Sequence, residues 1–369
     1  MRHIIFVIAS TLVCCSLAAA YEPQIDPSAY LSDRTADGEW WNKPYLAAFD
    51  KTLLRRAMSP ISVAGNQFVD ADGRVVVFRG VNIADPDKLA KNGRWNKQYF
   101  AEARRWGANI LRIPVHPVAW SSRGERGYIM LLDDAVQWAN ELGMYLIIDW
   151  HSIGNLSSGM YQHPMYDTTL QQTLQFWQTI ATRYRGITTI AFYELFNEPT
   201  TAGGKFGKLS WAEWKNINEA IIDMIYAHDD AVIPLVAGFN WAYDLSAARG
   251  NLIDRDGVAY VAHPYPQKAK VEPQQAQWDQ KFGFIAEHAP LIATEIGWMK
   301  EGERGAHVPV INNDGSYGPK IIDYLDGLGA SWVAWVFDPD WTPNLFTSWD
   351  YIPTEQGAFF KQVMLKENQ

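Results

Sequence analysis

The segment Tyr145-Leu-Ile-Ile-Asp-Trp-His151 is a short apolar run, and a second one, Ile190-Ala-Phe-Tyr-Glu-Leu-Phe-Asn197, follows about forty residues later. Between them, Leu170–Tyr184 repeats apolar residues with the period of an amphipathic helix. The two runs are therefore predicted to be buried strands joined by a helix. Strand, helix and strand in this order are typical of a parallel sheet whose faces are covered by helices.

The same alternation continues along most of the chain. Eight apolar, β-rich runs follow one another at intervals wide enough for a helix, and eight such units predict a (β/α)8 TIM barrel of the α/β class. An open doubly wound sheet is the alternative, but no Gly-rich phosphate loop follows the first run. The predicted strands are Val76–Ile83, Asn109–Val115, Tyr145–His151, Ile190–Asn197, Val232–Gly238, Val258–Tyr265, Pro290–Ile296 and Ser331–Phe337.

Helical periodicity is visible between most of these strands. Glycines follow several of the periodic segments, where a helix commonly ends on a left-handed residue; these are Gly107, Gly143, Gly186 and Gly329. Residues 239–257 show only a weak helical pattern. The predicted helices are Lys97–Trp106, Met130–Leu142, Leu170–Tyr184, Trp211–His228, Gln274–His288 and Pro319–Leu328.

Residues 1–20 have the pattern of a cleaved secretory signal. A basic start precedes an apolar run over residues 4–17, and Ala18-Ala-Ala20 follows it. An uncleaved anchor is the alternative, although the run is short for a membrane span. Both cysteines, Cys14 and Cys15, lie in this segment, so the secreted chain would have no thiol. We expect a periplasmic or extracellular protein that is not attached to a membrane once the signal is removed.

Three regions follow from these patterns: a signal peptide over 1–20, an N-terminal extension over 21–60 and one barrel domain over 61–369. The extension contains Trp40-Trp41 and is expected to pack on the domain through aromatic anchors. At the start of the domain, 61–70 and 74–78 flank Ala71-Asp-Gly73, which predicts a β-hairpin with Asp-Gly in its turn.

The composition narrows the class of partner. The 369 residues carry a formal net charge of -9, which gives no electrostatic attraction to nucleic acid or anionic lipid. Aromatic residues make up 14% of the chain, including 17 Trp. Trp is most often a core residue, but flat aromatic rings also stack on the apolar faces of sugars, and composition alone leaves both interpretations open.

Polar residues follow almost every predicted strand, at the end where barrel enzymes place their functional side chains. Two of them, Glu198 and Glu295, follow the fourth and seventh strands and would face each other across the barrel mouth. Retaining glycosidases use such a pair, about 5–5.5 Å apart, as a proton donor and a nucleophile. Either glutamate alone also fits a structural role in an ion pair or a helix cap.

A family resemblance rests on the order of these polar residues. The set Arg112, His151, Asn197-Glu198-Pro199, His263-Pro264-Tyr265, Glu295 and Trp335, on successive strand ends, resembles the active site of glycoside hydrolase family 5, the cellulase family of clan A. The resemblance covers roughly residues 61–365, and the segment Phe78-Arg-Gly-Val-Asn82 also looks like the start of that family's domain.

The resemblance implies a role for each matching residue. Glu198 would be the general acid/base and Glu295 the nucleophile, with Arg112 and Tyr265 lowering the pKa of Glu295 through positive charge and a hydrogen bond. The remaining matches would bind substrate: Asn197 at the sugar 2-hydroxyl, His151 and His263 at sugar hydroxyls or the carboxylates, and Trp335 as the floor of the cleavage site.

Further Trp residues follow the strands and are candidate stacking platforms. Trp241 and Trp298 are the two that we expect to bind substrate, while Trp150, Trp341 and Trp349 either join them or pack loops together. The substrate expected is a linear β-1,4-glucan, cleaved internally. Mannan, xyloglucan and other β-glucans are alternatives, and loop shapes leave endo and exo action open.

Other polar residues near the strand ends have competing interpretations. Glu194 and Asp149 lie deeper in the barrel and are expected to be buried partners of Arg112 or His151. His116 is either a sugar contact or a loop residue. A metal-dependent hydrolase using His116, His151, His263 and Asp149 is one rival, but no His-x-His follows the first strand and no close His/Asp pair has helical ligand spacing. A carbohydrate-binding barrel without activity is another. We expect no cofactor, no metal and a monomer.

Overall fold

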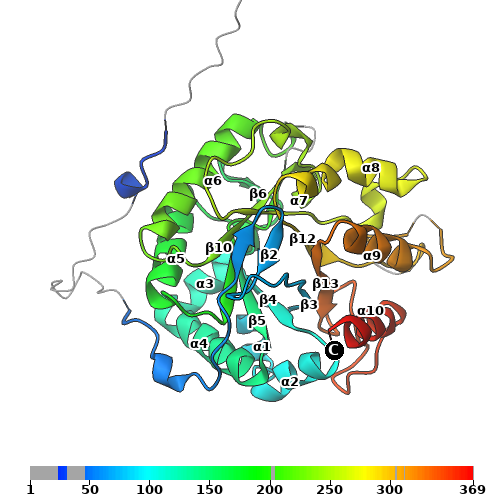
Figure 1. Ribbon diagram of the computed structural model, residues 1–369, viewed down its shortest axis with the longest axis horizontal. Coiled ribbons are helices and arrows are strands. Elements are labelled where there is room, and N and C mark those ends of the chain that lie inside the picture. The colour runs from blue at the N-terminus through cyan, green and yellow to red at the C-terminus, as the bar shows by residue number, and fades with distance from the viewer. Residues whose placement is uncertain (1–23, 31–45, 201–203, 304–305, 311, 369) are drawn as a thin grey trace, which may run out of the picture.

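The computed structural model describes residues 24–30, 46–200, 204–303, 306–310 and 312–368. Eight parallel strands close into a barrel in the order in which they occur in the chain, and helices surround it (Figure 1). This confirms the predicted (β/α)8 fold and excludes the open sheet. The barrel strands are β3 (Arg79–Ile83), β4 (Ile110–Val115), β5 (Tyr145–Trp150), β8 (Ile190–Glu194), β10 (Ile233–Ala237), β11 (Ala259–Val261), β12 (Leu291–Ile296) and β13 (Ser331–Phe337).

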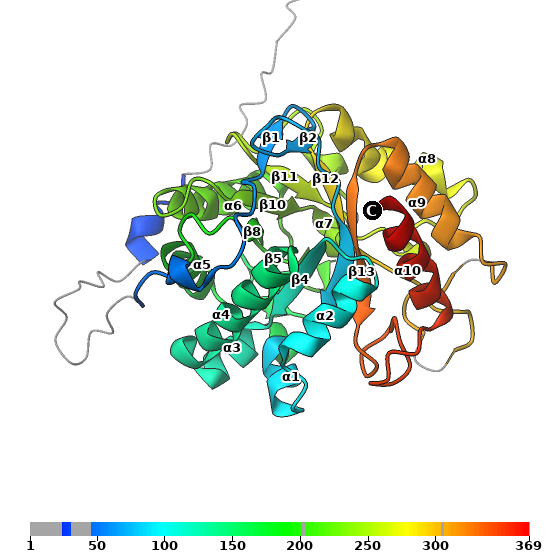
Figure 2. The same ribbon diagram turned by 60° about the horizontal axis from the view of Figure 1, so that its bottom comes forward.

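Helices follow the strands and cover the outside of the barrel (Figure 2). The α-helices are α1 (Pro86–Lys91), α2 (Lys97–Arg105), α3 (Pro117–Arg123), α4 (Glu125–Leu142), α5 (Leu170–Arg183), α6 (Trp211–Tyr226), α7 (Phe239–Ala242), α8 (Gln274–Lys281), α9 (Tyr317–Gly327) and α10 (Glu355–Glu367). Short 3-10 helices are η1 (Pro27–Tyr30), η2 (Lys51–Leu53), η3 (Pro164–Tyr166), η5 (Ser246–Ala248), η6 (Pro266–Lys268) and η7 (Gly283–Glu287).

Local sequence explains where several helices begin and end. A capping box starts α5, because the Thr169 side chain accepts from the backbone of Gln172 and the Gln172 side chain accepts from that of Thr169. Gly143 ends α4 in the left-handed region at φ 69°. Gly107, Gly186 and Gly329 also have positive φ, as their positions predict.

Two predicted helices differ in length from those observed. The segment predicted as Gln274–His288 ends as an α-helix at Lys281, and η7 continues it as 3-10 helix. The α-helix ends because Phe282 (φ -145°, ψ -25°) leaves the helical region, and at Gly283 a Cβ would lie 1.9 Å from the hydroxyl oxygen of Tyr324 on α9. The second helix, α4, begins at Glu125 rather than at the predicted Met130. Gly124, at φ 79°, separates α4 from α3. The helices α1, α3 and α10 were not predicted.

The N-terminal hairpin is present, but its turn is not the predicted one. Strands β1 (Ser62–Ala64) and β2 (Gln67–Val69) pair in antiparallel register around Gly65-Asn66, with Gly65 at φ 61°. The Asp-Gly turn follows β2 and leads only to a single bridge between Val69 and Val75. Gly65-Asn66 supplies the positive φ that a two-residue hairpin requires, which is why the chain turns there first.

The hairpin covers one end of the barrel, opposite the loops that follow the strands (Figure 2). Phe68 from β2 packs edge-on against Phe78 and Phe192, at ring-centroid distances of 5.9 and 4.9 Å. These rings join the apolar residues that fill the barrel interior, such as Ile147 and Leu235. The amino end of the barrel is therefore closed by apolar packing, and the carboxyl end remains for chemistry.

A second, three-stranded sheet stands at the carboxyl end of the barrel. It contains β6 (Ile153–Asn155), β7 (Met160–Tyr161) and β9 (Glu198–Pro199). Strand β6 pairs in antiparallel register with β7 and in parallel register with β9, with Ile153 opposite Glu198. This sheet ties the loop after β5 to the loop after β8, and it contains one of the two glutamates.

The described parts of the N-terminal extension pack on the outside of the barrel. Phe49 is buried and its backbone N–H donates to the carbonyl of Arg183 at the end of α5 (2.7 Å). The backbone N–H groups of Arg55 and Arg56 share Oδ1 of Asn140 on α4. The predicted signal segment 1–20 and the predicted anchor Trp40-Trp41 lie outside the described residues.

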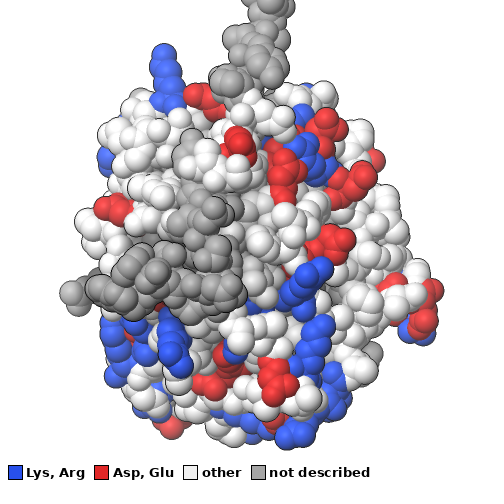
Figure 3. Space-filling model, turned by 90° about the vertical axis from the view of Figure 1, so that its left-hand side faces the viewer, with Lys and Arg blue, Asp and Glu red and all other residues white. Residues whose placement is uncertain are grey.

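The surface carries charges of both signs. On the face shown in Figure 3, basic and acidic side chains are interspersed over the described residues. In the described ranges, the helices all fall short of the length and apolar character needed to cross a membrane.

Candidate active site

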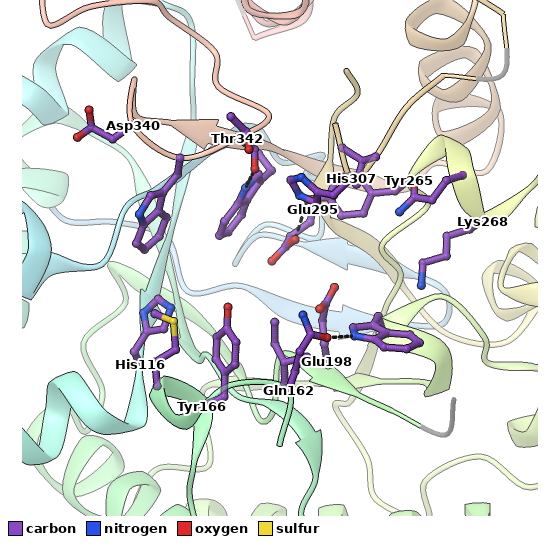
Figure 4. A pocket seen from close by; sticks show the side chains of 17 residues that line it. His116, Gln162, Tyr166, Glu198, Tyr265, Lys268, Glu295, His307, Asp340 and Thr342 are labelled. Carbon is purple, nitrogen blue, oxygen red and sulfur yellow. Dashed lines mark hydrogen bonds between the residues drawn. The ribbon is translucent and has the colours of Figure 1, made fainter. Parts of the chain in front are cut away.

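A cleft of about 680 Å³ opens at the carboxyl end of the barrel strands. Glu198 and Glu295 lie near its middle, with the other side chains spread to both sides of them (Figure 4). Its lining contains seven residues with aromatic or imidazole rings among other residues: His116, Ile153, Gln162, Met165, Tyr166, Glu198, Trp241, Tyr265, Gln267, Lys268, Glu295, His307, Val308, Trp335, Asp340, Trp341 and Thr342.

Glu198 is held in place by the three-stranded sheet. Barrel strand β8 ends at Glu194, and the chain then bends so that the backbone N–H of Asn197 donates to Trp150 and that of Glu198 donates to Ser152 (3.1 and 3.0 Å). Because these bonds come from the loop after the neighbouring strand β5, they fix where the Glu198 side chain starts. That side chain is only 8% exposed and lines the cleft.

Glu295 lies at an irregularity in the barrel. The pairing of β12 with β13 shifts register between Ala293 and Ile296, which is where a bulge re-aims side chains. The Thr294 carbonyl in this stretch accepts a 2.8 Å hydrogen bond from Nδ2 of Asn82 on β3. In the sequence, Asn82 stands out only as the end of the family-like segment Phe78–Asn82. In the structure, its hydrogen bond to Thr294 holds the strand next to Glu295 in place.

The two glutamates face each other across the cleft (Figure 4). One carboxylate oxygen of Glu198 and one of Glu295 lie within 4.8 Å of each other, and a ring nitrogen of His263 lies within the same distance of both. This separation is in the range of retaining rather than inverting glycosidases, whose carboxyl groups are about 6.5–9.5 Å apart.

Arg112 is the centre of a buried network beneath the cleft. Its guanidinium binds Glu194 through two nitrogens (2.7 and 2.8 Å) and Oε1 of Glu295 through Nη1 (3.0 Å). The same group also contacts Asp149 (3.0 Å) and Oδ1 of Asn197 (2.7 Å). Glu194 and Asp149 are thus buried partners of Arg112, as predicted.

The pKa of Glu295 corrects one expectation from the sequence. Burial raises the pKa of this carboxyl above its usual value, and the charge of Glu198 acts in the same direction. His263, Arg112 and the hydrogen bond from Tyr265 each lower the pKa of Glu295, as predicted for the last two, but they only partly offset the burial. The sequence shows the groups that lower the pKa of Glu295, but it does not show how deeply the Glu295 carboxyl is buried.

His263 bridges the two glutamates. Its Nδ1 lies 3.0 Å from Oε1 of Glu198 and 3.7 Å from Oε2 of Glu295, while Nε2 lies 3.0 Å from Oγ1 of Thr294. Burial alone would lower the pKa of His263, but Glu295, Glu194 and Glu198 together raise it to about 9. At neutral pH the ring is therefore a cation that donates to Glu198.

His151 has a different environment from His263. It is buried, its Nδ1 lies 2.6 Å from Oδ2 of Asp149, and its ring is stacked on Trp335 at 5.5 Å with an interplanar angle of 5°. Burial, together with the nearby charges of His116, Arg112 and His263, lowers its pKa well below the usual value. His151 is thus a neutral support behind Trp335 rather than a wall of the cleft.

Asn197 is the one residue of the buried group with a free donor. Its Oδ1 is taken by Arg112, and its Nδ2 is buried without a hydrogen-bond partner. A buried amide N–H that lacks a partner is costly unless a ligand supplies one. This geometry agrees with the predicted contact to a substrate hydroxyl.

The Trp residues divide into two groups. Trp335, Trp241 and Trp341 line the cleft, and the rings of Trp335 and Trp341 are nearly parallel, 6.0 Å apart with an interplanar angle of 13°. Trp298, which was predicted to bind substrate, lies outside this cleft. Its ring packs against Tyr317 on α9 and Phe360 on α10, because the chain after β12 turns outward toward those helices.

The remaining Trp candidates also belong to packing. Trp150 is buried and stacked on Phe176 at 4.1 Å, and Trp349 packs against Phe346. Several cleft residues were not found from the sequence, among them Tyr166, Gln162 and Lys268. They lie in loops after β7 and β11, where no periodic pattern marks which side chains point inward. His116, for which the sequence allows either a sugar contact or a loop position, lines the cleft, and its Nδ1 lies 2.9 Å from Oδ2 of Asp85.

The four residues named in the metal-dependent alternative do not form a metal-compatible cluster in the described parts of the structure. Among the described residues, the cluster with metal-compatible spacing is Glu198, His263 and Glu295, not His116, His151, His263 and Asp149. His263 lies between the two carboxylates, with its Nδ1 3.0 Å from Glu198 and 3.7 Å from Glu295. The cluster is better suited to proton transfer and nucleophilic attack.

Known proteins resemble this chain over most of its length. Endoglucanase A of Butyrivibrio fibrisolvens is 26% identical over 259 residues, which cover 66% of this chain and 55% of that protein. The chain thus spans about half the length of the curated relatives that it matches. Among solved structures, the β-glucanase SdGluc5_26A of Saccharophagus degradans is 54% identical with a TM-score of 0.87, over 90% of this chain and all of that one.

A second structure of the same Saccharophagus degradans enzyme, in complex with cellotetraose, is 53% identical to this chain with the same TM-score of 0.87. The sequence model described as Cellulase (glycosyl hydrolase family 5) matches residues 69–340. This range contains β3 to β13 and every residue of the buried network described above. The chain therefore belongs to glycosyl hydrolase family 5.

Proposed function

We propose that the chain is a retaining glycoside hydrolase that cleaves internal β-1,4 linkages of a linear β-glucan, with Glu198 as general acid/base and Glu295 as nucleophile. The observation that carries the proposal is the pair of carboxylates, with oxygens within 4.8 Å of each other in one cleft. The Saccharophagus degradans β-glucanase, which was solved with cellotetraose, supports the choice of a β-1,4-linked glucose polymer.

In the first step, Glu295 attacks the anomeric carbon while Glu198 gives its proton to the departing oxygen. A covalent glycosyl-enzyme forms, and the leaving sugar departs with its new hydroxyl. In the second step Glu198 takes a proton from water, whose oxygen displaces Glu295 from the anomeric carbon. The two inversions together retain the configuration of the sugar.

The surrounding residues prepare both glutamates. Arg112 at Oε1 and Tyr265 at Oε2 favour the ionised form of Glu295 against the effect of its burial. The His263 cation donates to Glu198 and lies near Glu295, so it stabilises negative charge on either carboxylate as each is ionised during the reaction. The free amide of Asn197 would donate to the sugar 2-hydroxyl, where hydrogen bonds strengthen in the transition state.

Stacking sites extend the cleft to both sides of the glutamates. His116 and Asp340 lie on one side of the glutamates and Lys268 lies on the other (Figure 4). The ring of Trp341 meets those of His116 and Trp335, and Trp241 lies beneath the ammonium of Lys268. Sugar binding on both sides of the cleaved bond suits endo action on a polymer. Mannan, xyloglucan and mixed-linkage β-glucan remain alternative substrates of the same chemistry.

Two measurements test the proposal. A reducing-sugar assay over a panel of β-glucans, mannan and xyloglucan identifies the substrate, and proton NMR of the first product shows its anomeric configuration. We expect the β-anomer first. The α-anomer would contradict the nucleophile role of Glu295, and no reducing sugar from any polymer would contradict the enzyme class.

Variants separate the two roles. Glu198→Gln and Glu295→Gln should each lower kcat on polysaccharide by about 10³-fold or more, because each removes an indispensable group. Glu287→Gln is the matched control, since this glutamate is exposed at the end of η7. A fully active Glu295→Gln enzyme would refute the assignment.

We also propose that residues 1–20 are removed during secretion, that 61–369 form the catalytic domain and that the enzyme acts as a monomer. The basic, apolar and small-residue pattern at the start of the chain supports the first point. Amino-terminal sequencing of protein from the periplasm and the medium tests it. Light scattering of the purified protein tests the monomer.

A further inference from the structure

Lys268 is a partly buried lysine in the wall of the cleft that the mechanism above does not use. It ends η6, three residues after Tyr265. Its ammonium donates to the backbone carbonyl of Asn240 (2.8 Å) and lies 3.4 Å from Oδ1 of the same residue. The ammonium also lies over the ring of Trp241, 4.6 Å from the centroid. Lys268 thus binds both the backbone and the aromatic side chain of one short turn.

That turn occupies most of the segment labelled α7, which is not a regular helix, and its backbone is unfavourable. Asn240, Trp241 and Ala242 have φ values of 57°, 56° and 53°, in the left-handed region that side chains other than glycine rarely adopt. Such a conformation costs about 1 kcal/mol or more per residue and persists only where the surroundings fix it. The Lys268 bond to the Asn240 carbonyl is one such restraint, and the bond from the backbone N–H of His263 to the carbonyl of Ala242 is another.

The turn presents Trp241 to the cleft, and the ring is fixed on two more sides. Its Nε1 donates to Oε1 of Gln162 (2.6 Å), and its edge meets the ring of Phe206 at 6.4 Å. Because the ammonium of Lys268 covers one face of the indole, only the other face is left for stacking on a sugar. The orientation of this face therefore depends on Lys268.

The position of Glu198 shows which half of the cleft contains the Trp241 ring. Lys268 lies on one side of the carboxylate pair, and His116 and Asp340 lie on the other (Figure 4). The segment Phe239–Ala242 packs against β9, the strand that contains Glu198, the proposed proton donor to the leaving group. Trp241 and Lys268 therefore belong to the half of the cleft that receives the leaving sugar.

We propose that Lys268 is a positioning and specificity residue of the leaving-group half of the cleft, where it holds the Asn240–Ala242 turn and the Trp241 ring in place to stack on the first sugar beyond the cleaved bond. The inference rests on the proposed function. It assigns Lys268 no part in the chemistry of Glu198 or Glu295.

The burial of Lys268 is consistent with such a role. Burial lowers the pKa of this amine to about 8, against the opposing effect of Glu198. A lysine that served only solubility would keep its ammonium in water. An ammonium has three N–H donors, and Asn240 offers acceptors for two of them, so one is available for a hydroxyl of the leaving sugar.

Two substrates separate this role from a general structural one. Cellopentaose places sugars on both sides of the cleaved bond, whereas β-cellobiosyl fluoride has only a fluoride on the leaving side and needs no stacking there. We expect Lys268→Met to lower kcat/KM on cellopentaose about tenfold more than on the fluoride, the size expected for losing one cation–π contact and one hydrogen bond. The loss should be mostly in KM.

Companion variants make the result specific. Lys268→Arg keeps the cation and a donor for the Asn240 carbonyl, so it should restore part of the lost kcat/KM on cellopentaose. In the background of Trp241→Ala, Lys268→Met should cause little further loss, because the platform it positions is already gone. Lys270→Met is the matched control, since Lys270 is an exposed lysine two residues away.

The outcomes distinguish this inference from the proposed function. If Lys268→Met lowers kcat/KM equally on both substrates, or on neither, or if its effect adds fully to that of Trp241→Ala, the positioning role is refuted while the enzyme assignment stands. If the unaltered protein cleaves neither substrate, the proposed function fails and this inference fails with it.

Discussion

The hydroxyl of Tyr265 donates a 2.8 Å hydrogen bond to Oε2 of Glu295, while Arg112 binds Oε1 of the same carboxylate. Both oxygens of the proposed nucleophile are therefore bound before substrate arrives. Burial raises the pKa of Glu295, and the Tyr265 bond is one of the interactions that oppose the rise. This relationship makes the acid side of the pH profile a direct report on Tyr265.

Tyr265→Phe should shift that profile in one direction. Without the hydrogen bond the pKa of Glu295 rises further, so the acidic limb of kcat/KM moves to higher pH. We also expect kcat to fall by about tenfold to a hundredfold, in the range of one hydrogen bond to a charged group. The measurement is kcat/KM between pH 4 and 8, with Tyr324→Phe as control because its hydroxyl binds Asp279 between α8 and α9. An acidic limb that stays in place or moves downward would contradict this account of Glu295.

Arg112 is expected to be essential for stability as well as activity. Arg112→Met leaves Glu194, Asp149 and Glu295 buried without their shared cation, and breaking a buried pair in this way costs about 3–5 kcal/mol. Urea unfolding at pH 7 measures the loss. Lys300→Met provides the comparison, because its ion pair with Glu355 is exposed on both sides and should be worth less than about 1 kcal/mol. Equal effects of the two variants would refute the role of Arg112 as the centre of the network.

The stability contributed by His263 should depend on pH. Its pKa is about 9 in the folded protein and about 6.5 in an unfolded chain, so binding the proton stabilises the fold by on the order of 3 kcal/mol. This contribution is fully present below pH 6.5 and is lost as the pH rises through 9. His263→Gln should therefore destabilise the protein more at pH 6 than at pH 9.5, as measured by urea unfolding.

His228 supplies a control of opposite sign. Burial lowers the pKa of His228 in the folded protein, so protonating it opposes folding, and His228→Gln should become relatively more stable as the pH falls. If His263→Gln showed the same trend as His228→Gln, the protonated state assigned to His263 would be wrong.

Trp298 and Trp335 should respond differently to the same substitution. Trp298→Leu removes packing against α9 and α10 and is expected to cost about 2–4 kcal/mol of unfolding free energy with KM unchanged within about twofold. Trp335→Leu removes a ring that lines the cleft next to the glutamates and should lower kcat/KM on cellopentaose by more than tenfold. Thermal unfolding and steady-state kinetics on both variants check the distinction. A large rise in KM for Trp298→Leu would contradict this distinction and would indicate that Trp298 contacts the substrate.

Much of the site was predictable because barrel topology converts order in the chain into proximity in space. The eight strand segments were recognisable from local apolar runs, and parallel strands bring all their carboxyl ends to one edge. Arg112, Asn197, Glu198, His263, Tyr265 and Glu295 meet there as expected, with Glu194 and Asp149 beneath them. These residues lie on strands or within a few positions of a strand end, where the backbone direction is already set.

Residues in longer loops were harder to assign. Trp241 and Trp298 each follow a strand closely, yet the first lines the cleft and the second packs outside it. The difference comes from the left-handed turn at Asn240–Ala242 in one case and from contacts with α9 and α10 in the other. Neither leaves a periodic signal in the sequence, because both depend on partners far away in the chain.

The sequence by itself determined the alternation of strands and helices, the closure into a barrel and the polar residues that end each strand, since all three depend on local pattern and strand order. Only the tertiary structure decided the separation of Glu198 and Glu295, the raised pKa of Glu295 and the restraint of Trp241 by Lys268. Distance, burial and the orientation of a side chain are sums over everything that surrounds a residue, and those surroundings exist only once the chain has folded.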